Sequence, residues 1–288
     1  MPNMWTVAGV VLPAVLAGLG VLRGEVVVSP ATRDVDGFLI HRVECEHQAA
    51  PTELRVLLPD ALANSTADKP RSAKNEWPVV YLLPVEAGRE KRFGDGIATV
   101  AAMDAANRYG AIIVQPTFTA LPWYADHPTD RSLAQETYFV DVVVPSIEKL
   151  YPTIREPRGR LLVGFSKSGW GAWSLLLRHP EMFGKAASWD APLMMSWPSK
   201  YGSQPIFGTE ANFEKYRLTR LLDERADSLR SASAESPRLI LLGRGNFNDH
   251  GPIHEQLDRL QIPHVYRNGP KTPHAWDKAW LEPCSTRS

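Results

Sequence analysis

The chain has 288 residues, of which 44% are hydrophobic, and its 32 basic and 32 acidic residues give a formal net charge of zero. A length in this range allows a single α/β domain with a sizeable core. Nucleic-acid-binding proteins normally carry an excess of basic residues, so the balanced charge argues against that class. The two cysteines, Cys45 and Cys284, form no CxxC pair and no Cys/His spacing typical of zinc sites. We interpret them as two unpaired thiols, or as a disulfide if the protein is exported.

The N-terminal segment is apolar. Residues 5–22 contain no charged side chain, and the first basic residue is Arg23. Such a run is long enough for a membrane anchor or for the core of a signal peptide. No Lys or Arg precedes it and no clean cleavage site follows, so an apolar extension of a cytoplasmic enzyme is the alternative. We treat residues 1–23 as a leader that exports or anchors the protein, with membrane association through this segment only, and residues 24–288 as one domain.

Predicted strands and helices alternate along the rest of the chain. A continuous apolar run, typical of a strand buried on both faces, occurs at 78–84, and 111–116 is predicted as another buried strand. A further strand is predicted at 160–164, and short apolar strands at 185–189 and 238–242. Shorter strands are expected at 24–28, 37–43, 54–59 and 264–266. Helical spacing is present at 97–109, at 133–150 with a kink at Pro145, at 171–177 and at 255–260, and residues 64–76 read as an exposed polar loop. This alternation predicts an α/β fold with a mainly parallel central sheet and helices on both of its faces.

The segment 161–172, L-L-V-G-F-S-K-S-G-W-G-A, combines an apolar strand, a tight turn and a helix. This context is typical of a nucleophile elbow, G-x-S-x-G, in which the residues two before and two after the nucleophile must be small. Gly164 meets the first need, and Ser168 stands where the second glycine usually stands. We therefore predict Ser166 as the nucleophile, because Ser168 would have the bulky Trp170 two residues later. The alternative is a serine- and glycine-rich turn without a catalytic role.

A serine hydroxyl needs a base, and in this type of fold the partners follow in the order serine, acid, histidine. Asp249 follows the predicted strand at 238–242, and His274 lies in a loop after the last strand. We predict these two as acid and base. Asp190, after the preceding strand, is the alternative acid, and Asp249 would then be a turn residue. His250 and His254 precede the expected loop and are interpreted as surface or capping residues.

The order of motifs resembles the esterase D-like "putative esterase" family of α/β-hydrolases, which includes feruloyl esterases, S-formylglutathione hydrolases, enterochelin esterases and mycolyltransferases. The resemblance covers about residues 50–282. Its motifs are P-V-V-Y-L-L at 78–83, W-Y at 123–124, V-P-S-I-E at 144–148 with Tyr151, the elbow at 164–172, H-P-E-M-F at 179–183, and H-A-W at 274–276 with Trp280. The resemblance implies an α/β-hydrolase fold and ester hydrolysis by a serine.

The loop after the strand that ends at Leu83 departs from the family pattern. The family usually has His-Gly or Asp-Gly there, whereas this chain has P-V-E-A-G at 84–88. The resemblance implies that the backbone N–H of Lys167 is one oxyanion donor and that this loop supplies the other, which we expect at the Glu86 N–H. The Glu86 side chain should point away, because a carboxylate would repel a forming oxyanion. Alternatively, the loop no longer forms a competent oxyanion hole. A final helix after Trp280 is expected to be short or missing.

Four tryptophans, Trp123, Trp170, Trp189 and Trp276, lie near the proposed site segments. We predict that they line a substrate pocket, with plain core packing, the indole N–H hydrogen-bonded, as an equal alternative. The side chain of Lys167 could attract an anionic substrate, or it could simply be solvated.

The predicted function is that of a serine esterase. Ser166 attacks an ester carbonyl, His274 acts as general base and Asp249 stabilises the imidazolium. Backbone N–H groups hold the oxyanion, and water releases the acyl-enzyme. The substrate would be a small-molecule or carbohydrate ester, and this mechanism needs no metal or cofactor. The alternatives are acyl transfer to an alcohol by the same triad, and a non-catalytic pseudo-hydrolase that binds a carbohydrate or a protein.

Overall fold

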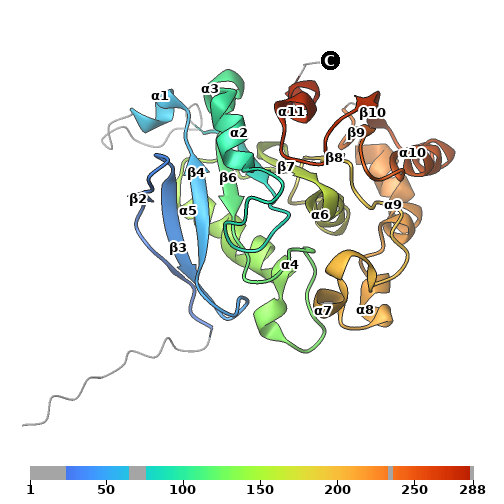
Figure 1. Ribbon diagram of the computed structural model, residues 1–288, viewed down its shortest axis with the longest axis horizontal. Helices are drawn as coiled ribbons and strands as arrows, with labels where there is room; N and C mark the ends of the chain where they lie inside the picture. Colours follow the sequence, from blue (N-terminus) through green and yellow to red (C-terminus); the bar gives the residue numbers. More distant parts are fainter. Residues whose placement is uncertain (1–23, 65–75, 233–235, 286–288) are drawn as a thin grey trace, which may run out of the picture.

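The computed structural model describes residues 24–64, 76–232 and 236–285 (Figure 1). The predicted leader, residues 1–23, and most of the predicted polar loop at 64–76 lie outside the described residues. Within the described ranges, no helix is both long and apolar enough to cross a membrane. Cys45 is a free thiol.

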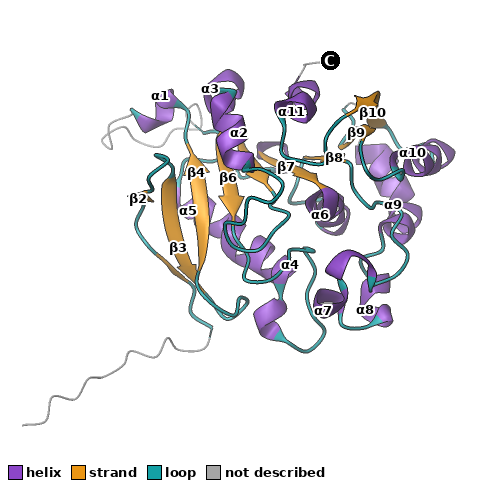
Figure 2. Cartoon of the chain, in the orientation of Figure 1, coloured by secondary structure: helices purple, strands orange, loops and turns teal. Residues whose placement is uncertain are grey.

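A ten-stranded mixed sheet runs through the molecule in the order β1-β3-β4-β6-β5-β7-β8-β9-β10, with β2 paired to β3 (Figure 2). Neighbouring strands in the run β6-β5-β7-β8-β9-β10 are parallel. Strands β1, β2 and β4 each pair antiparallel with β3, and β4 pairs antiparallel with β6. The strands are β1 Val27–Val28, β2 Thr32–Arg33, β3 Leu39–Glu44, β4 Thr52–Leu57, β5 Val79–Leu82, β6 Ile112–Pro116, β7 Arg160–Phe165, β8 Lys185–Trp189, β9 Leu239–Arg244 and β10 His264–Lys271. The predicted parallel sheet is thus confirmed in its central and C-terminal part, and an antiparallel section extends it at one edge.

Helices cover both faces of the sheet. The α-helices are α1 Asp60–Ala63, α2 Gly96–Ala102, α3 Ala105–Tyr109, α4 Gln135–Thr137, α5 Val144–Leu150, α6 Ser166–Arg178, α7 Gln204–Phe207, α8 Glu210–Glu214, α9 Leu218–Ala232, α10 His250–Arg259 and α11 Lys278–Ser285. A π-helix, η3 Tyr138–Val143, joins α4 to α5. The described residues also form the short 3₁₀ helices η2 Arg131–Leu133, η4 Pro157–Gly159 and η5 Lys200–Gly202.

The apolar strands explain the two layers, because successive side chains of a strand point to opposite faces. In β5 and the residue after it, Tyr81 and Leu83 belong to one core cluster and Leu82 to the other. The first cluster is covered by η3, α5, α6, α9 and α10, and the second by α2, α3 and α11.

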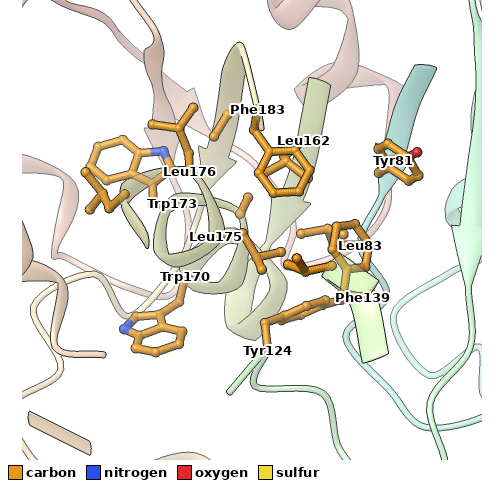
Figure 3. Close-up of a cluster of buried hydrophobic side chains, with 14 of the residues drawn as sticks. Tyr81, Leu83, Tyr124, Phe139, Leu162, Trp170, Trp173, Leu175, Leu176 and Phe183 are labelled. Atoms are coloured by element: carbon orange, nitrogen blue, oxygen red, sulfur yellow. The ribbon is translucent and has the colours of Figure 1, made fainter. Parts of the chain in front are cut away.

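Helix α6 forms the centre of the larger cluster (Figure 3). Its buried Trp170, Trp173 and Leu175 lie among aromatic and aliphatic side chains from the strands and from η3. Phe139 packs edge-on against Tyr81, with ring centroids 5.3 Å apart. This dense packing fixes the helix that begins at Ser166.

Two predicted helices differ in detail from the observed ones. The region 97–109 forms two helices, α2 and α3, because Asp104 has a positive φ of 52° that interrupts the helix. In the region 133–150, residues 135–150 form one continuous helical segment with a π-helix just before Pro145, and the non-helical Ala134 separates it from the 3₁₀ helix that ends at Leu133. Proline lacks a backbone N–H, so the i→i−4 bond is lost there and the irregularity appears where the sequence predicted a kink.

Candidate active site

The nucleophile elbow forms between β7 and α6. Ser166 has φ of 51°, a left-handed conformation that is costly for a residue with a side chain. A Cβ added at Gly164 would lie 2.3 Å from the carbonyl oxygen of Ser168, so only glycine fits there. Ser166 is 6% exposed, and its backbone N–H donates to the Asp190 carbonyl oxygen at 3.2 Å. The strained turn is the geometry that the sequence motif predicted for this serine.

Ser168 has a structural role in the same turn. Its Oγ donates to the Phe165 carbonyl oxygen at 2.9 Å and accepts from the Phe165 N–H at 3.1 Å. The side chain is completely buried. The hydroxyl therefore caps the first turn of α6, which explains why a serine can stand where the family usually has glycine and why it is no rival to Ser166.

His274 makes a short hydrogen bond of 2.6 Å from Nδ1 to Asp190 Oδ2, which is a correction to the expected pairing with Asp249. The pairing register of β7 with β8 sets Phe165 opposite Trp189, so the next residues, Ser166 and Asp190, leave neighbouring strands at the same edge of the sheet. The Asp190 side chain is fully buried.

Backbone donors complete the surroundings of the Asp190 carboxylate. The Phe247 N–H donates to Asp190 Oδ1 at 2.7 Å. Burial raises the pKa of Asp190, but the hydrogen bonds from His274 and from the backbone N–H groups of Phe247 and Asn246 outweigh it, so the pKa is lowered from its ordinary value. The carboxylate is thereby held in its charged form beside the imidazole.

Asp249 lies elsewhere, directly before α10. Its Oδ2 accepts the Met194 N–H at 2.8 Å, and burial raises its pKa above the ordinary value. Gly245 explains why the segment after β9 supplies no acid. A Cβ added there would lie 2.0 Å from Asp190 Oδ2, so the carboxylate of Asp190 fills the space that a side chain from the β9 turn would enter.

The imidazole of His274 lies among three aromatic rings. Ring centroids of Phe93 and Phe165 are each 5.1 Å away, and that of Phe247 is 5.7 Å away. The loop is fixed on both sides of the histidine, because the Pro273 carbonyl accepts the Trp280 Nε1–H at 2.8 Å and the Trp276 N–H donates to the Phe93 carbonyl at 2.7 Å. Since Phe165 directly precedes Ser166, its contact with His274 brings base and nucleophile segments together.

The expected oxyanion loop is also anchored. The Tyr124 hydroxyl donates to the Pro84 carbonyl at 2.7 Å, and the Gly88 N–H donates to the Phe118 carbonyl at 2.8 Å. The Glu86 carboxylate lies 3.5 Å from the Lys167 Nζ, and both side chains are largely buried. The ion pair neutralises the carboxylate that would otherwise repel an oxyanion. In the sequence Tyr124 stands out only as part of the W-Y motif at 123–124, which gives no sign that its hydroxyl anchors this loop.

The Lys167 N–H lies in the first turn of α6, where backbone donors have no partner within the helix. Such a donor beside a nucleophile is suited to hold a developing oxyanion. The Lys167 side chain pairs with Glu86, so neither of the two sequence-based interpretations, an anion attractor or a solvated surface chain, describes it.

The predicted substrate-binding tryptophans separate into two groups. Trp276 lines a small hollow together with Glu86, Arg89 and Gln115, whereas Trp189 is fully buried and stacks on Phe165. Trp123 and Trp170 have no exposed surface and pack edge-on, with centroids 5.7 Å apart. These two follow the core-packing interpretation and present no surface to a ligand. Their indole nitrogens find no hydrogen-bond partner among the described residues, unlike the bonded N–H that this interpretation expected.

Comparison with known proteins agrees with this architecture. The model of the family described as "Putative esterase" matches residues 52–238. No curated protein matches the chain at a significant level. Among solved structures, a ferulic acid esterase is 19% identical with a TM-score of 0.61, and 88% of this chain and 93% of that chain are covered.

Two proteins of Staphylococcus aureus have similar structures. An S-formylglutathione hydrolase is 18% identical, with a TM-score of 0.63 and coverage of 84% of this chain and 95% of that chain. A fluorophosphonate-binding serine hydrolase F, in a substrate-bound structure, is 15% identical, with a TM-score of 0.63 and coverage of 91% and 95%. At these identities the likeness describes the fold, whereas the family match covers most of the chain. The chain therefore belongs to the "Putative esterase" family and is a hydrolase with the α/β-hydrolase fold.

Proposed function

We propose that this protein is a serine carboxylic ester hydrolase with the triad Ser166, His274 and Asp190. The observation that carries the proposal is the 2.6 Å bond from His274 Nδ1 to Asp190 Oδ2 beside a serine in a strained elbow. The bond to a carboxylate makes Nδ1 the protonated nitrogen, which leaves the Nε2 lone pair as the acceptor for the serine proton.

The reaction then proceeds in two stages. Ser166 Oγ attacks the ester carbonyl as His274 Nε2 takes its proton, and the imidazolium returns that proton to the leaving alcohol. The backbone N–H groups of Lys167 and Glu86 stabilise the oxyanion, which is strongest in a site that excludes water. A water molecule, activated by the same imidazole, releases the acyl group. Asp190 stays ionised throughout, because its lowered pKa lies well below neutral pH.

The substrate class is a small-molecule or carbohydrate ester. A small hollow beside the Glu86 loop is lined by polar and charged side chains, including Arg89 and Gln115, which suit hydroxyl groups of a substrate that extends over this loop. The structural neighbour named as a ferulic acid esterase makes feruloyl esters an obvious first choice. Rates with p-nitrophenyl, acetyl-sugar and feruloyl esters, measured side by side, define the acyl preference.

The decisive experiment is labelling by a fluorophosphonate probe together with ester hydrolysis. Ser166→Ala should abolish labelling and lower kcat by about 10⁶-fold, with an unchanged circular dichroism spectrum. Ser168→Ala is the matched control and should still be labelled. Labelling that persists in Ser166→Ala but disappears in Ser168→Ala would reassign the nucleophile. No labelling of the wild-type protein at all would favour the pseudo-hydrolase, and acyl transfer to an added alcohol in preference to water would favour the acyltransferase.

The base is tested in the same assay. His274→Ala should remove nearly all activity, whereas His250→Ala, in the neighbouring helix, should leave it largely intact. Loss of activity in His274→Ala with an unchanged circular dichroism spectrum would assign the role of base to this histidine. Near-normal activity of His274→Ala would contradict a serine–histidine couple.

A further inference from the structure

A group of potential metal ligands lies where α10 meets β10. His254 and Asp258 are one helical turn apart on α10, and His264 is the first residue of β10. One ligand atom of each residue lies within 4.8 Å of the others. His254 Nδ1 is 2.8 Å from His264 Nε2, and Asp258 Oδ1 is 3.9 Å from the same His264 nitrogen. Two imidazoles and a carboxylate therefore converge on one small volume.

The hydrogen bonds define which nitrogen carries each lone pair. His264 Nδ1 lies 2.8 Å from the Ile262 carbonyl oxygen, which can only accept, so Nδ1 carries the proton when the ring is neutral. The His264 Nε2 lone pair is then free, and in the neutral pair His254 Nδ1 must donate to it. Metal-bound histidines are usually oriented in this way, by donation of the other ring N–H to a carbonyl or carboxylate.

Both rings are held in place by their surroundings. The His264 side chain is only 6% exposed, and the His254 ring stacks on Tyr266 with centroids 3.9 Å apart and an interplanar angle of 26°. The segment from α10 to β10 is short, and Gln261 turns it with φ of 55°. Asp258 is 63% exposed, so the open side of the group faces solvent.

We propose that His254, Asp258 and His264 bind a divalent transition-metal ion of the Zn²⁺ type, with water completing the coordination. Imidazole and carboxylate ligands suit Zn²⁺, Co²⁺, Ni²⁺ or Cu²⁺, whereas Mg²⁺ and Ca²⁺ prefer all-oxygen sites. Tetrahedral Zn–N bonds of about 2.0 Å put two nitrogens roughly 3.3 Å apart. The two histidine nitrogens must therefore separate by about half an ångström from their present 2.8 Å.

Binding requires no net loss of a proton. The ion replaces the proton between the two rings, and that proton moves from His254 Nδ1 to His254 Nε2, which faces Asp258 Oδ2 at 3.5 Å. The sequence does not mark this site, because its ligands follow no zinc-motif spacing. The third ligand, His264, comes from β10, which turns back beside α10.

The site is separate from ester hydrolysis. His264 opens β10, while the loop of His274 follows its carboxyl end at Lys271. A strand of this length spans roughly 23 Å, since each residue advances about 3.3 Å. The ion would connect α10 to the edge strand and stabilise the region that carries the His274 loop, without contact with the reacting atoms.

The test is a Zn²⁺ titration of the tag-free, chelator-treated protein by calorimetry, with thermal unfolding in parallel. The wild-type protein should bind one equivalent, and Tm should rise by about 5 °C at a hundredfold excess over Kd. Co²⁺ in place of Zn²⁺ should give a visible spectrum of a low-coordinate nitrogen and oxygen site. Esterase activity should be the same with and without the ion.

Three variants decide the assignment. His254→Ala and Asp258→Ala should each lose both the saturable binding and the shift in Tm, and Asp258 is exposed enough that its removal does not threaten folding. Glu255→Ala, on the same helix and also exposed, is the matched control and should bind as the wild type does. Absence of saturable binding in the wild type, or unchanged binding in both ligand variants, would show that the group is only a hydrogen-bonded cluster.

Discussion

The turn after β8 and the turn after β9 each present an aspartate, and the two carboxylates have opposite environments. Asp190 receives hydrogen bonds from His274 and from backbone N–H groups, and its pKa is lowered. Asp249 has one backbone donor, from Met194, and burial raises its pKa. A carboxylate that must remain charged beside an imidazole needs the first environment. The acid therefore stands at the turn that places hydrogen-bond donors around a carboxylate, and chain order alone does not reveal which of the two turns does so.

The largest effect that this comparison predicts is on turnover. Asp190→Asn keeps the shape of the side chain but no longer holds the right tautomer of His274, so kcat should fall by about 10⁴-fold. Asparagine also tolerates the positive φ of 43° at this position, which makes the variant suitable for a clean test. Steady-state kinetics with a p-nitrophenyl ester provide the measurement. Asp249→Asn is the control, and a severe loss there beside a near-normal Asp190→Asn would restore the sequence-based assignment.

A second experiment moves the acid from one turn to the other. The Asp190 carboxylate fills the space that a side chain at Gly245 would enter, so Gly245→Asp alone should clash and unfold or inactivate the protein. In the double variant Asp190→Gly, Gly245→Asp the space is free, and glycine accepts the positive φ at 190. The exchange should recover at least tenfold in kcat relative to Asp190→Gly, which corresponds to about 1.4 kcal/mol of activation free energy. The control is the double variant Asp190→Gly, Gly245→Asn, which lacks the carboxylate. If the aspartate-bearing variant is no more active than this control, the two turns are not interchangeable.

The elbow provides a third, smaller effect, this time on stability. Ser168→Ala removes both hydrogen bonds between the Ser168 hydroxyl and the backbone of Phe165 in a fully buried turn. The free energy of unfolding should fall by about 2 kcal/mol, and Tm by about 5 °C, while kcat is largely retained. Thermal unfolding and ester hydrolysis, measured on the same sample, separate the loss of stability from any loss of activity. A loss of activity much larger than the loss of stability would give Ser168 a direct role in the reaction.

The sequence predicted what is local and missed what is not. The strand, the turn and the helix around Ser166 lie within one short segment, so the small residues that the turn requires were readable. The pairing of Asp190 with His274 joins residues 84 positions apart and depends on the register of β7 with β8. No periodicity reports such a register, and both aspartates follow apolar strands, so the residues alone could not choose between them.

In the fold, too, the local elements were largely predictable, and the direction of strand pairing was not. The apolar runs predicted most strands of the sheet, and Pro145 predicted the irregularity in the helical segment 135–150. Helix α9 was missed, although its buried Leu218, Leu221, Leu222 and Leu229 have helical spacing. The antiparallel direction of β3 and β4 was not predicted, because alternation of side chains is the same in both directions and only the partner strand decides it.

The smallest predicted effect is the pH dependence of stability, and its sign differs between the two aspartates. A carboxyl whose pKa is raised in the folded state makes folding less favourable once it ionises, so Asp249→Asn should raise Tm slightly at neutral pH. A carboxyl whose pKa is lowered stabilises the fold above the unfolded-state value of about 3.9, and this contribution is lost as the pH falls through the folded-state value. Asp190→Asn should therefore lower Tm at neutral pH, and both differences should shrink toward zero in acid. Thermal unfolding of the wild type and the two variants between about pH 3 and about pH 7 measures them. Differences of the same sign for both variants would contradict the opposite environments of the two turns.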